Sequence, residues 1–344
     1  MAAAATIAAV PTTRPPFRWI ISRGVDLSLV SGSVLAGYAY LLLYTVLHVK
    51  ISYLWWFWSV GFDGTHIFAT ATRTFFDREA RARHRGLFFG SVLFFFALGP
   101  AMVLAGLKGY LYLLVGVWAY YHVIRQHYGF MVLYKVKNRD LRPLDNKLDR
   151  VFIGVMLVAP PFHRFFIHHP EELGIKLAFP QFEPVMWALV AATAAVYLGR
   201  QFVRYRGGEE LDLPKQLLFA AVIPLHWTTF AYMSWQAAVP TVTIVHNLQY
   251  HALVWFHNRN RYFEDGVARH GRIPTAVSRS LLMYAAAGLV FSLAYRIPGY
   301  QLGQISDLAF GFFCGFGLTH YYLDSRIWRV RHDPGLREAL GLGG

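Results

Sequence analysis

The stretch TIVHNLQYHALVWFHNRNRY, residues 243–262, begins as apolar as a membrane helix and ends in arginines. Its middle nevertheless carries three histidines, His246, His251 and His257. Ionisable side chains are expensive inside a bilayer, and those that occur there usually face the interior of a helix bundle. This stretch therefore predicts a transmembrane helix that brings polar groups to an interior site.

The whole chain has the composition of a membrane protein. Of its 344 residues, 56% are hydrophobic and only 15% are charged, whereas soluble domains carry about 25% charged residues. Many windows of about 18–25 residues are nearly free of charge, which is long enough to cross the hydrocarbon core. These runs are continuous rather than alternating, which argues against an outer-membrane barrel. We expect an all-α, polytopic transmembrane helix bundle.

The expected organisation is a single integral membrane domain over residues 1–344. It has an N-terminal arm (1–26), a helix bundle (27–324) and a basic tail (325–344). Pro180, Pro240 and Pro298 fall near predicted connections, where proline is common. Ten spans are predicted, at 27–48, 53–72, 87–105, 110–134, 151–168, 184–203, 216–238, 240–257, 278–295 and 304–324.

Basic residues alternate across these spans. Of the 33 lysines and arginines, 27 fall in the N-terminal arm, in every second connection and in the tail; five fall on the opposite side. Arg125 is the one inside a span. By the positive-inside rule both termini are cytoplasmic. We expect an integral protein of a bacterial inner membrane. The net charge of +14 is explained in this way. No loop joins a long basic run to aromatic residues, so no nucleic-acid partner is expected.

Histidines and aspartates gather in four even-numbered spans. Their depth is counted at 1.5 Å per residue from the first basic residue beyond each helix. Four histidines lie about 9–12 Å below the cytoplasmic boundary on this count: His66, His127, His251 and His320. His122 and His246 lie five residues deeper. The predicted site residues are Asp63 and His66, His122 and His127, His246 and His251, and His320 and Asp324. Neutral imidazoles and carboxylates suit zinc, iron, manganese or copper, and this number suffices for two ions.

The spacing within each helix leaves several arrangements open. Asp63 and His66 share a face, as do His320 and Asp324, so each aspartate is either a ligand or an acceptor that orients its histidine. The paired histidines of spans four and eight are five residues apart, about 140° around a helix. The two histidines of a pair can bind the same ion only if the helix has a π-bulge or a bend between them. Otherwise they bind two different ions or face two sides of a cavity.

Other polar residues near these spans have weaker assignments. Gln126 and Asn247 each share a face with a site histidine and are either partners of the ligands or ordinary interhelical hydrogen-bond donors. Arg125 either pairs with Asp63 or Asp324 or reaches the interface. His257 is expected at a solvated interface, and His226 is a weak candidate in a separate helix.

Two short motifs resemble the membrane histidine-box oxygenases, the fatty-acid desaturase and hydroxylase group. HVIRQH (122–127) and HNLQYH (246–251) fit that group's first box, although the candidate core has no His-x-x-His-His box. The resemblance implies two irons that activate oxygen against a lipid chain. The layout also resembles the bacterial Brp/Blh-like carotene dioxygenases, polytopic proteins whose iron is held by histidines on helices.

These observations predict a membrane oxidoreductase with a metal site near the cytoplasmic face. The expected cofactor is iron, as two ions, with zinc or haem as alternatives. The expected substrate is a membrane lipid or isoprenoid, with an electron-donor protein as a possible partner. Three alternatives stay open: a proton or metal-ion transporter, a bis-histidine haem protein, and a zinc hydrolase. No Gly-x-Ser-x-Gly motif is present to indicate a serine hydrolase.

Overall fold

The structure, a computed structural model, describes residues 17–174 and 176–342. Within these residues the protein is all-helical, with 84% of residues in helices and no strand. The predicted all-α fold class is confirmed. Residues 1–16 of the predicted N-terminal arm and the last two residues of the tail lie outside the described residues.

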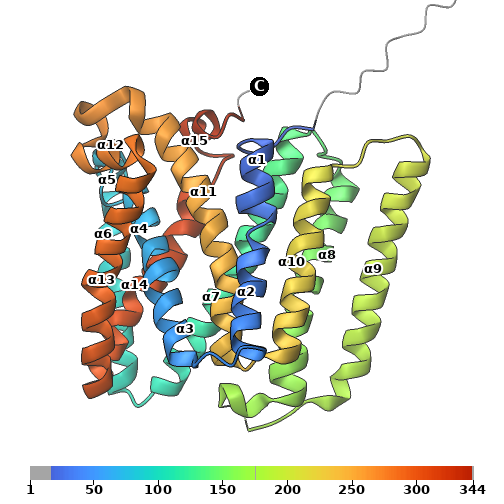
Figure 1. Cartoon of the computed structure of the whole chain (residues 1–344), viewed down its shortest axis with the longest axis horizontal. Coiled ribbons are helices and arrows are strands. Elements are labelled where there is room, and N and C mark those ends of the chain that lie inside the picture. Colours follow the sequence, from blue (N-terminus) through green and yellow to red (C-terminus); the bar gives the residue numbers. More distant parts are fainter. Residues whose placement is uncertain (1–16, 175, 343–344) are drawn as a thin grey trace, which may run out of the picture.

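The long helices stand side by side and α9 forms one edge of the bundle (Figure 1). Several helices are interrupted by short π-helical or 3-10 segments, labelled η. In chain order the helical segments are α1 (Arg23–Val25), η1 (Asp26–Ser31), α2 (Val34–Thr45), α3 (Ile51–Trp58), η2 (Ser59–Asp63), α4 (Gly64–Arg73), α5 (Arg78–Arg83), α6 (Arg85–Leu104), α7 (Lys108–Lys137), α8 (Pro143–Phe162), η3 (His163–His168), η4 (Pro170–Leu173), η5 (Pro180–Phe182), α9 (Glu183–Arg206), α10 (Leu213–Tyr232), α11 (Trp235–His270), α12 (Arg272–Arg279), α13 (Leu281–Ile305), α14 (Asp307–Ile327) and α15 (Pro334–Ala339).

Five helical stretches are long and apolar enough to cross a membrane. The helices that carry the predicted site residues are not among them, because their histidines and charged residues lower their mean hydropathy. The count of ten spans and the cytoplasmic position of both termini stay predictions. The five stretches are Arg23–Thr45, Arg85–Leu104, Pro143–His168, Pro180–Arg206 and Leu281–Ile305.

Two prolines expected near connections lie inside helices instead, Pro240 in α11 and Pro298 in α13. Proline has no N–H, so Pro240 leaves the carbonyl of Gln236, four residues earlier, without its helical donor. The indole Nε1 of Trp55 donates to this carbonyl at 2.7 Å. The helix therefore continues through Pro240, because a neighbouring helix satisfies the freed carbonyl.

Helices α6 and α14 approach each other at two glycines. A Cβ atom on Gly99 would lie 1.9 Å from the carbonyl oxygen of Gly311, so neither helix tolerates a side chain at this crossing. Small residues of this kind allow the backbones of membrane helices to pack closely. The contact fixes α14, which carries His320.

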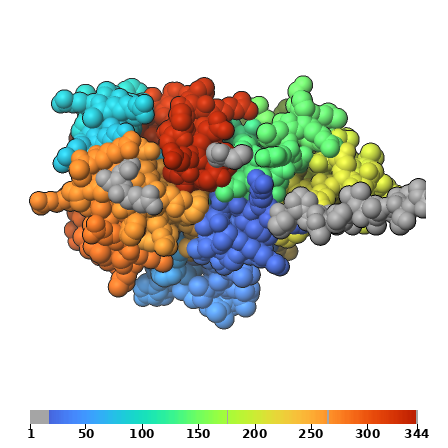
Figure 2. Space-filling view, turned by 90° about the horizontal axis from the view of Figure 1, so that it is seen from above, coloured from blue at the N-terminus to red at the C-terminus, as the bar shows by residue number. Residues whose placement is uncertain are grey.

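The predicted basic tail is partly folded onto the bundle. α1, α5, α12 and α15 lie at the same end of the molecule, which we call the arginine-rich end (Figure 1). Viewed onto this end, the C-terminal segment (red) lies beside the region of α5 (cyan) and that of α11 and α12 (orange) (Figure 2). Leu336 and Leu340 are fully buried in the core, and the Nδ2 of Asn260 donates to the carbonyl of Ala339 at 2.8 Å.

The predicted position of His257, which also lies at the arginine-rich end, is wrong. It was expected at a solvated interface, but it is 2% exposed and packs against the ring of Trp328. The reason is that α11 continues as a helix past His257 as far as a kink at Gly266, and the C-terminal segment covers it. The basic residues that were assigned to a loop after residue 257 therefore lie on helical segments, before and after this kink in α11 and on α12.

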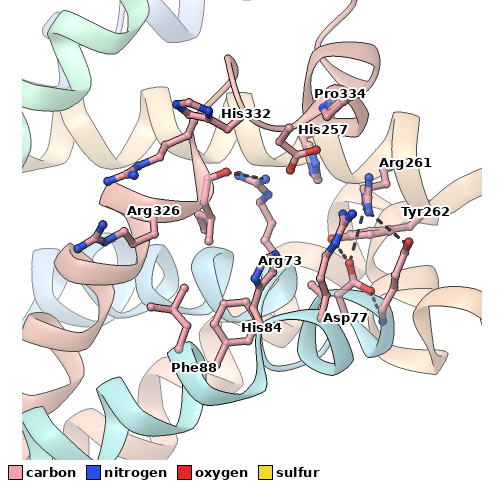
Figure 3. A pocket seen from close by; sticks show the side chains of 17 residues that line it. Arg73, Asp77, His84, Phe88, His257, Arg261, Tyr262, Arg326, His332 and Pro334 are labelled. Carbon is pink, nitrogen blue, oxygen red and sulfur yellow. Dashed lines mark hydrogen bonds and ion pairs between the residues drawn. The ribbon is translucent and has the colours of Figure 1, made fainter.

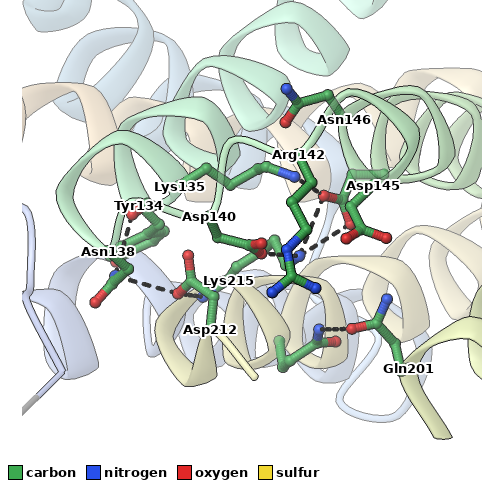
Figure 4. A network of polar contacts seen from close by, with 12 residues as sticks. Tyr134, Lys135, Asn138, Asp140, Arg142, Asp145, Asn146, Gln201, Asp212 and Lys215 are labelled. Carbon is green, nitrogen blue, oxygen red and sulfur yellow. Dashed lines mark hydrogen bonds and ion pairs between the residues drawn. The ribbon is translucent and has the colours of Figure 1, made fainter. Parts of the chain in front are cut away.

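Buried ion pairs join α7, α8, α9 and α10 at the arginine-rich end (Figure 4). The Nζ of Lys215 lies 3.2 Å from Asp140 Oδ2 and 3.0 Å from Asp149 Oδ1, and Lys135 also contacts Asp149. Arg204 forms two hydrogen bonds with Asp140, of 3.0 and 3.3 Å. Burial by itself raises the pKa of Asp140. The nearby cations Lys215 and Arg204 lower this pKa by more than burial raises it, so it stays below its usual range. These charges are buried in paired form, and each depends on its partners.

Candidate metal centre

Four histidines from four helices converge in the interior of the bundle. His66 lies on α4, His122 on α7, His246 on α11 and His320 on α14. One ring nitrogen from each lies within 4.8 Å of those from the other three. The residues are between 2% and 9% exposed. Of the eight predicted site residues, these four meet at one point.

The hydrogen bonding of these imidazoles is incomplete. Each keeps a buried nitrogen without a partner: Nδ1 of His66 and His246, and Nε2 of His122 and His320. Buried polar atoms in native proteins almost always have a partner. Neutral imidazole nitrogens are the ligands that zinc, iron and copper accept. The donor set therefore fits a metal ion.

On His66 and His246 the nitrogens that face each other are the Nε2 atoms and not the unpartnered Nδ1 atoms, and their spacing is a separate observation that fits a shared ion. Their Nε2 atoms are 3.1 Å apart. Two nitrogens that each lie about 2.0–2.1 Å from a shared ion are separated by roughly 2.8–3.4 Å when their angle at the ion is between 90° and tetrahedral. The pair can share one proton in the absence of metal, and it has the spacing of two ligands of one ion.

A hydroxyl from α4 fixes the tautomer of His320. Thr70 donates its hydroxyl proton to Asp324 Oδ1 at 2.8 Å. Thr70 can then only accept from His320, whose Nδ1 lies 2.7 Å away. His320 therefore carries its proton on Nδ1, and its Nε2 has a free lone pair. Histidine ligands of metals are commonly oriented by such a partner on the second ring nitrogen.

Asp324 acts through Thr70 and not by direct contact with the histidines. Its carboxylate lies 3.8 Å from both His320 Nδ1 and His122 Nε2, beyond hydrogen-bond distance. It accepts a second proton from the hydroxyl of Tyr250 at 2.8 Å. Thr70 was missed in the sequence, whereas Tyr250 adjoins His251 there and its interpretation was open between a cavity-lining residue, a hydrogen-bond donor to a ligand and a packing residue. Both stand four residues after a site histidine on the same helix, and this spacing places them on the same face.

His251 lies beside the four histidines, but both of its nitrogens are engaged. Nε2 is 3.0 Å from the hydroxyl of Thr65, and Nδ1 is 2.9 Å from the hydroxyl of Tyr284. The Thr65 proton is directed to backbone carbonyls of its own helix, so His251 Nε2 is the donor to Thr65. His251 therefore has no free lone pair for a metal.

His127 faces a different neighbour. Its ring centre is 5.5 Å from that of His226 on α10, and both of its nitrogens are buried without a hydrogen-bond partner. His226 is in turn 2.8 Å from the hydroxyl of Tyr120, which donates to the carbonyl of Leu157. The predicted site therefore divides into the four-histidine cluster and a separate His127–His226 pair.

Asp63 forms an ion pair with Arg296 of α13. Arg125, which was a possible partner of Asp63, is exposed and lies 4.9 Å from the ring of Tyr128. Of the two predicted amides, Gln126 donates to the backbone carbonyl of His246 at 2.7 Å, and the Nδ2 of Asn247 is buried without a partner. Gln126 thus joins α7 to α11 beside the cluster.

An apolar cavity of about 510 Å³ adjoins the cluster on the side away from the arginine-rich end. Asp63, Ala119, Thr243 and Gly317 line it, and each stands three residues before one of the four histidines on its helix. The four histidines therefore lie one helical turn beyond the cavity. Much of the remaining wall is aromatic, including Trp55, Trp58, Trp235, Phe313 and Phe316.

A second group of possible ligands lies at the opposite end of the bundle. His163, His168 and Glu183 place one ligand atom each within 4.8 Å of one another. The group is partly exposed and its nitrogens already contact the Glu183 carboxylate, at 2.9 Å for His163 and 3.4 Å for His168. It is a weaker candidate than the buried cluster.

The fold and the site define an all-helical protein with apolar, membrane-length helices and a buried four-histidine cluster. Comparison of the chain with protein-family models, curated proteins and solved structures found no match. The functional argument therefore rests on the geometry of the cluster and its cavity.

Proposed function

We propose that the protein is a membrane-embedded, metal-dependent oxidoreductase of the oxygenase, desaturase or hydroxylase type, acting on an apolar lipid or isoprenoid. The observation that carries the proposal is the position of the buried histidine cluster one turn from a large apolar cavity. Such a cavity has the size of small-molecule sites, which are about 300–1,000 Å³. The aromatic wall suits a hydrocarbon substrate.

The geometry favours one ion, although the sequence suggested two. His66, His122, His246 and His320 would hold it. Iron bound there would supply the oxygen-activating redox chemistry that side chains lack. Four imidazoles complete a tetrahedral zinc site but leave positions open on a six-coordinate ion, so the donor set favours iron over a catalytic zinc. A haem would accept only two of the four imidazoles, because its porphyrin occupies the equatorial positions.

The protein's own residues have separate tasks in this proposal. The histidines hold the ion, and Thr70 keeps the proton of His320 on Nδ1. The aromatic cavity binds the substrate and excludes water beside the ion. Asp63 and Arg296, both in the cavity wall, would contact a polar group of the substrate.

Metal analysis of the purified protein tests the proposal. Measurements are made in a His168→Ala background, so that the exposed group at the opposite end does not contribute. We expect about one iron per chain and no Soret band. Alanine at position 66, 122, 246 or 320 should remove the iron, whereas His251→Ala should retain it. Full iron content in all four cluster variants, or zinc filling the cluster, would refute the proposal.

Oxygen uptake with lipid and carotenoid substrates then separates the reaction types. A desaturase or hydroxylase requires an electron-donor protein or an added reductant, whereas a dioxygenase does not. The proposal includes a bacterial inner membrane with the arginine-rich end in the cytoplasm. A reporter fused after residue 344 tests that orientation.

A further inference from the structure

A second cavity, of about 370 Å³, opens at the arginine-rich end, on the other side of the histidine cluster from the apolar cavity. It lies between the end of α4, α5, α11 and the C-terminal segment (Figure 3). Five arginines line it: Arg73, Arg83, Arg261, Arg326 and Arg329. Arg73 is at the buried floor, and Arg83, Arg326 and Arg329 are at the exposed rim.

The carboxylates in the wall are already engaged. Asp77 lies 3.0 Å from His270, and Glu79 lies 3.2 Å from Arg261. Asp333 accepts from the backbone N–H of Leu336 and so caps α15. Within the described part of the chain, no carboxylate lies within 4.0 Å of Arg73, Arg83, Arg326 or Arg329. The cavity therefore has a net excess of cationic groups.

Arg73 is the most unusual of these groups, since it is only 8% exposed. Its Nη2 donates to the carbonyl of Ile327 at 3.3 Å, and its guanidinium lies 3.7 Å from the ring of Trp328. Its Nε and Nη1 have no acceptor. A buried cation with unmet donors is costly unless an anion pairs with it. The stacking on Trp328 holds the guanidinium in place before any ligand arrives.

We propose that this cavity binds a phosphate-bearing anion, with Arg73 donating at the floor and Arg326 and Arg329 contributing from the rim. Guanidinium groups match phosphate oxygens in pairs of parallel hydrogen bonds. Several arginines around one cavity suit a ligand of two or more negative charges better than a single carboxylate. Such a ligand is either a soluble phosphate compound or the headgroup of an anionic phospholipid.

The soluble arm of the test uses inorganic pyrophosphate and the full-length protein in uncharged detergent. Isothermal titration calorimetry should show saturable binding that weakens as salt increases. Arg73→Gln should weaken the binding at least tenfold. The double variant Arg326→Gln with Arg329→Gln should weaken it several-fold, and it tests the proposal even if Arg73→Gln fails to fold. Arg337→Gln, exposed on α15 and outside the cavity, is the matched control and should bind as the wild type does.

The lipid arm uses nanodiscs of phosphatidylcholine with or without cardiolipin, whose headgroup carries two phosphates, followed by native mass spectrometry. Cardiolipin retained by the wild type and lost in the arginine variants assigns the ligand to a lipid headgroup. Pyrophosphate binding without retained lipid assigns it to a soluble compound. The proposal is overturned if neither ligand binds saturably or if the cavity variants bind both as the control does. It is equally overturned if polyglutamate occupies the cavity and pyrophosphate does not compete, because the face would then fit an acidic protein.

Discussion

Thr70→Val offers the sharpest test of how the histidine cluster is held. Valine has nearly the shape of threonine, so the substitution removes the hydroxyl with little change in packing. Three polar contacts meet at this oxygen: it accepts from His320 Nδ1 at 2.7 Å, donates to Asp324 Oδ1 at 2.8 Å, and lies 2.8 Å from the hydroxyl oxygen of Tyr250. Without it, His320 loses the acceptor that fixes its tautomer, and Asp324 loses one of its donors.

The expected effect on metal binding follows from these contacts. Removing the partner that orients a histidine ligand lowers metal affinity about 10–100-fold. This corresponds to about 1.4–2.8 kcal/mol, at about 1.4 kcal/mol per factor of ten. The metal-free protein should also lose about 1–3 kcal/mol of stability, because buried groups are left without partners. The two losses are separable, since only the first depends on metal.

The assay is a competition titration of the metal against a chelator, paired with thermal unfolding of the metal-free protein. Thr241→Val is the matched control. Thr241 is also fully buried, but its hydroxyl donates to the carbonyl of Ala237 on its own helix, away from the cluster. Metal affinity of Thr70→Val within twofold of that of Thr241→Val would refute the assignment of Thr70 as the orienting group.

Three further predictions concern other parts of the molecule. His246→Ala should lose bound metal, whereas His251→Ala should keep it within about threefold because both nitrogens of His251 are engaged; elemental analysis of the two variants decides, and equal losses contradict the assignment. Lys215→Met should destabilise the protein by about 3–5 kcal/mol in denaturant unfolding, because it leaves Asp140 and Asp149 short of a cation; the exposed control Lys147→Met should change stability by less than about 0.5 kcal/mol. Burial raises the pKa of Asp212 from 3.8 to about 6, so the folded state binds the carboxyl proton more tightly than the unfolded state does. The free energy of unfolding therefore falls as pH rises from about 4 to about 6. Asp212→Asn keeps the acceptor for the N–H of Lys215 and should remove that slope, on the order of 2–3 kcal/mol in total; parallel pH profiles of the two proteins would contradict it.

The helical class and the identity of the four site helices could be predicted from the sequence, but the choice of histidine within two of them could not. Depths were counted from Lys135 on α7 and Arg259 on α11, as if each marked the membrane boundary. Both residues lie inside helices, which continue to Lys137 in α7 and to the kink at Gly266 in α11. Lys135 is moreover 2% exposed and paired with Asp149. The reference points on these two helices were therefore not interfacial, and the histidines that join His66 and His320 are the deeper pair, His122 and His246.

Direction around the helix also decides which histidines meet. Residues five apart differ by about 140° on a helix, so a pair with this spacing cannot face one point unless the helix deforms. The π-helical segments η1, η2 and η3 lie elsewhere, and α7 and α11 have none between their paired histidines. His127 and His251 consequently face His226 and Tyr284. Sequence alone gives the angle between the members of a pair, but tertiary packing determines which member faces the centre.

The helix that contains α4 carries a sequence pattern from which side-chain direction could be predicted correctly. Asp63, the last residue of η2, is followed by His66, Thr70 and Arg73 of α4 at spacings of three, four and three residues, which places them on one face of the continuous helix. Each reaches a different level of the interior. Asp63 meets Arg296 at the apolar cavity, His66 joins the cluster, Thr70 orients His320, and Arg73 lies at the floor of the arginine cavity. A polar stripe with helical period needs no reference to a membrane boundary, because it fixes direction and relative depth together. The same reasoning predicts that moving this stripe by one residue, through a single insertion before Asp63, would rotate all four side chains by about 100° and disrupt both cavities and the cluster at once.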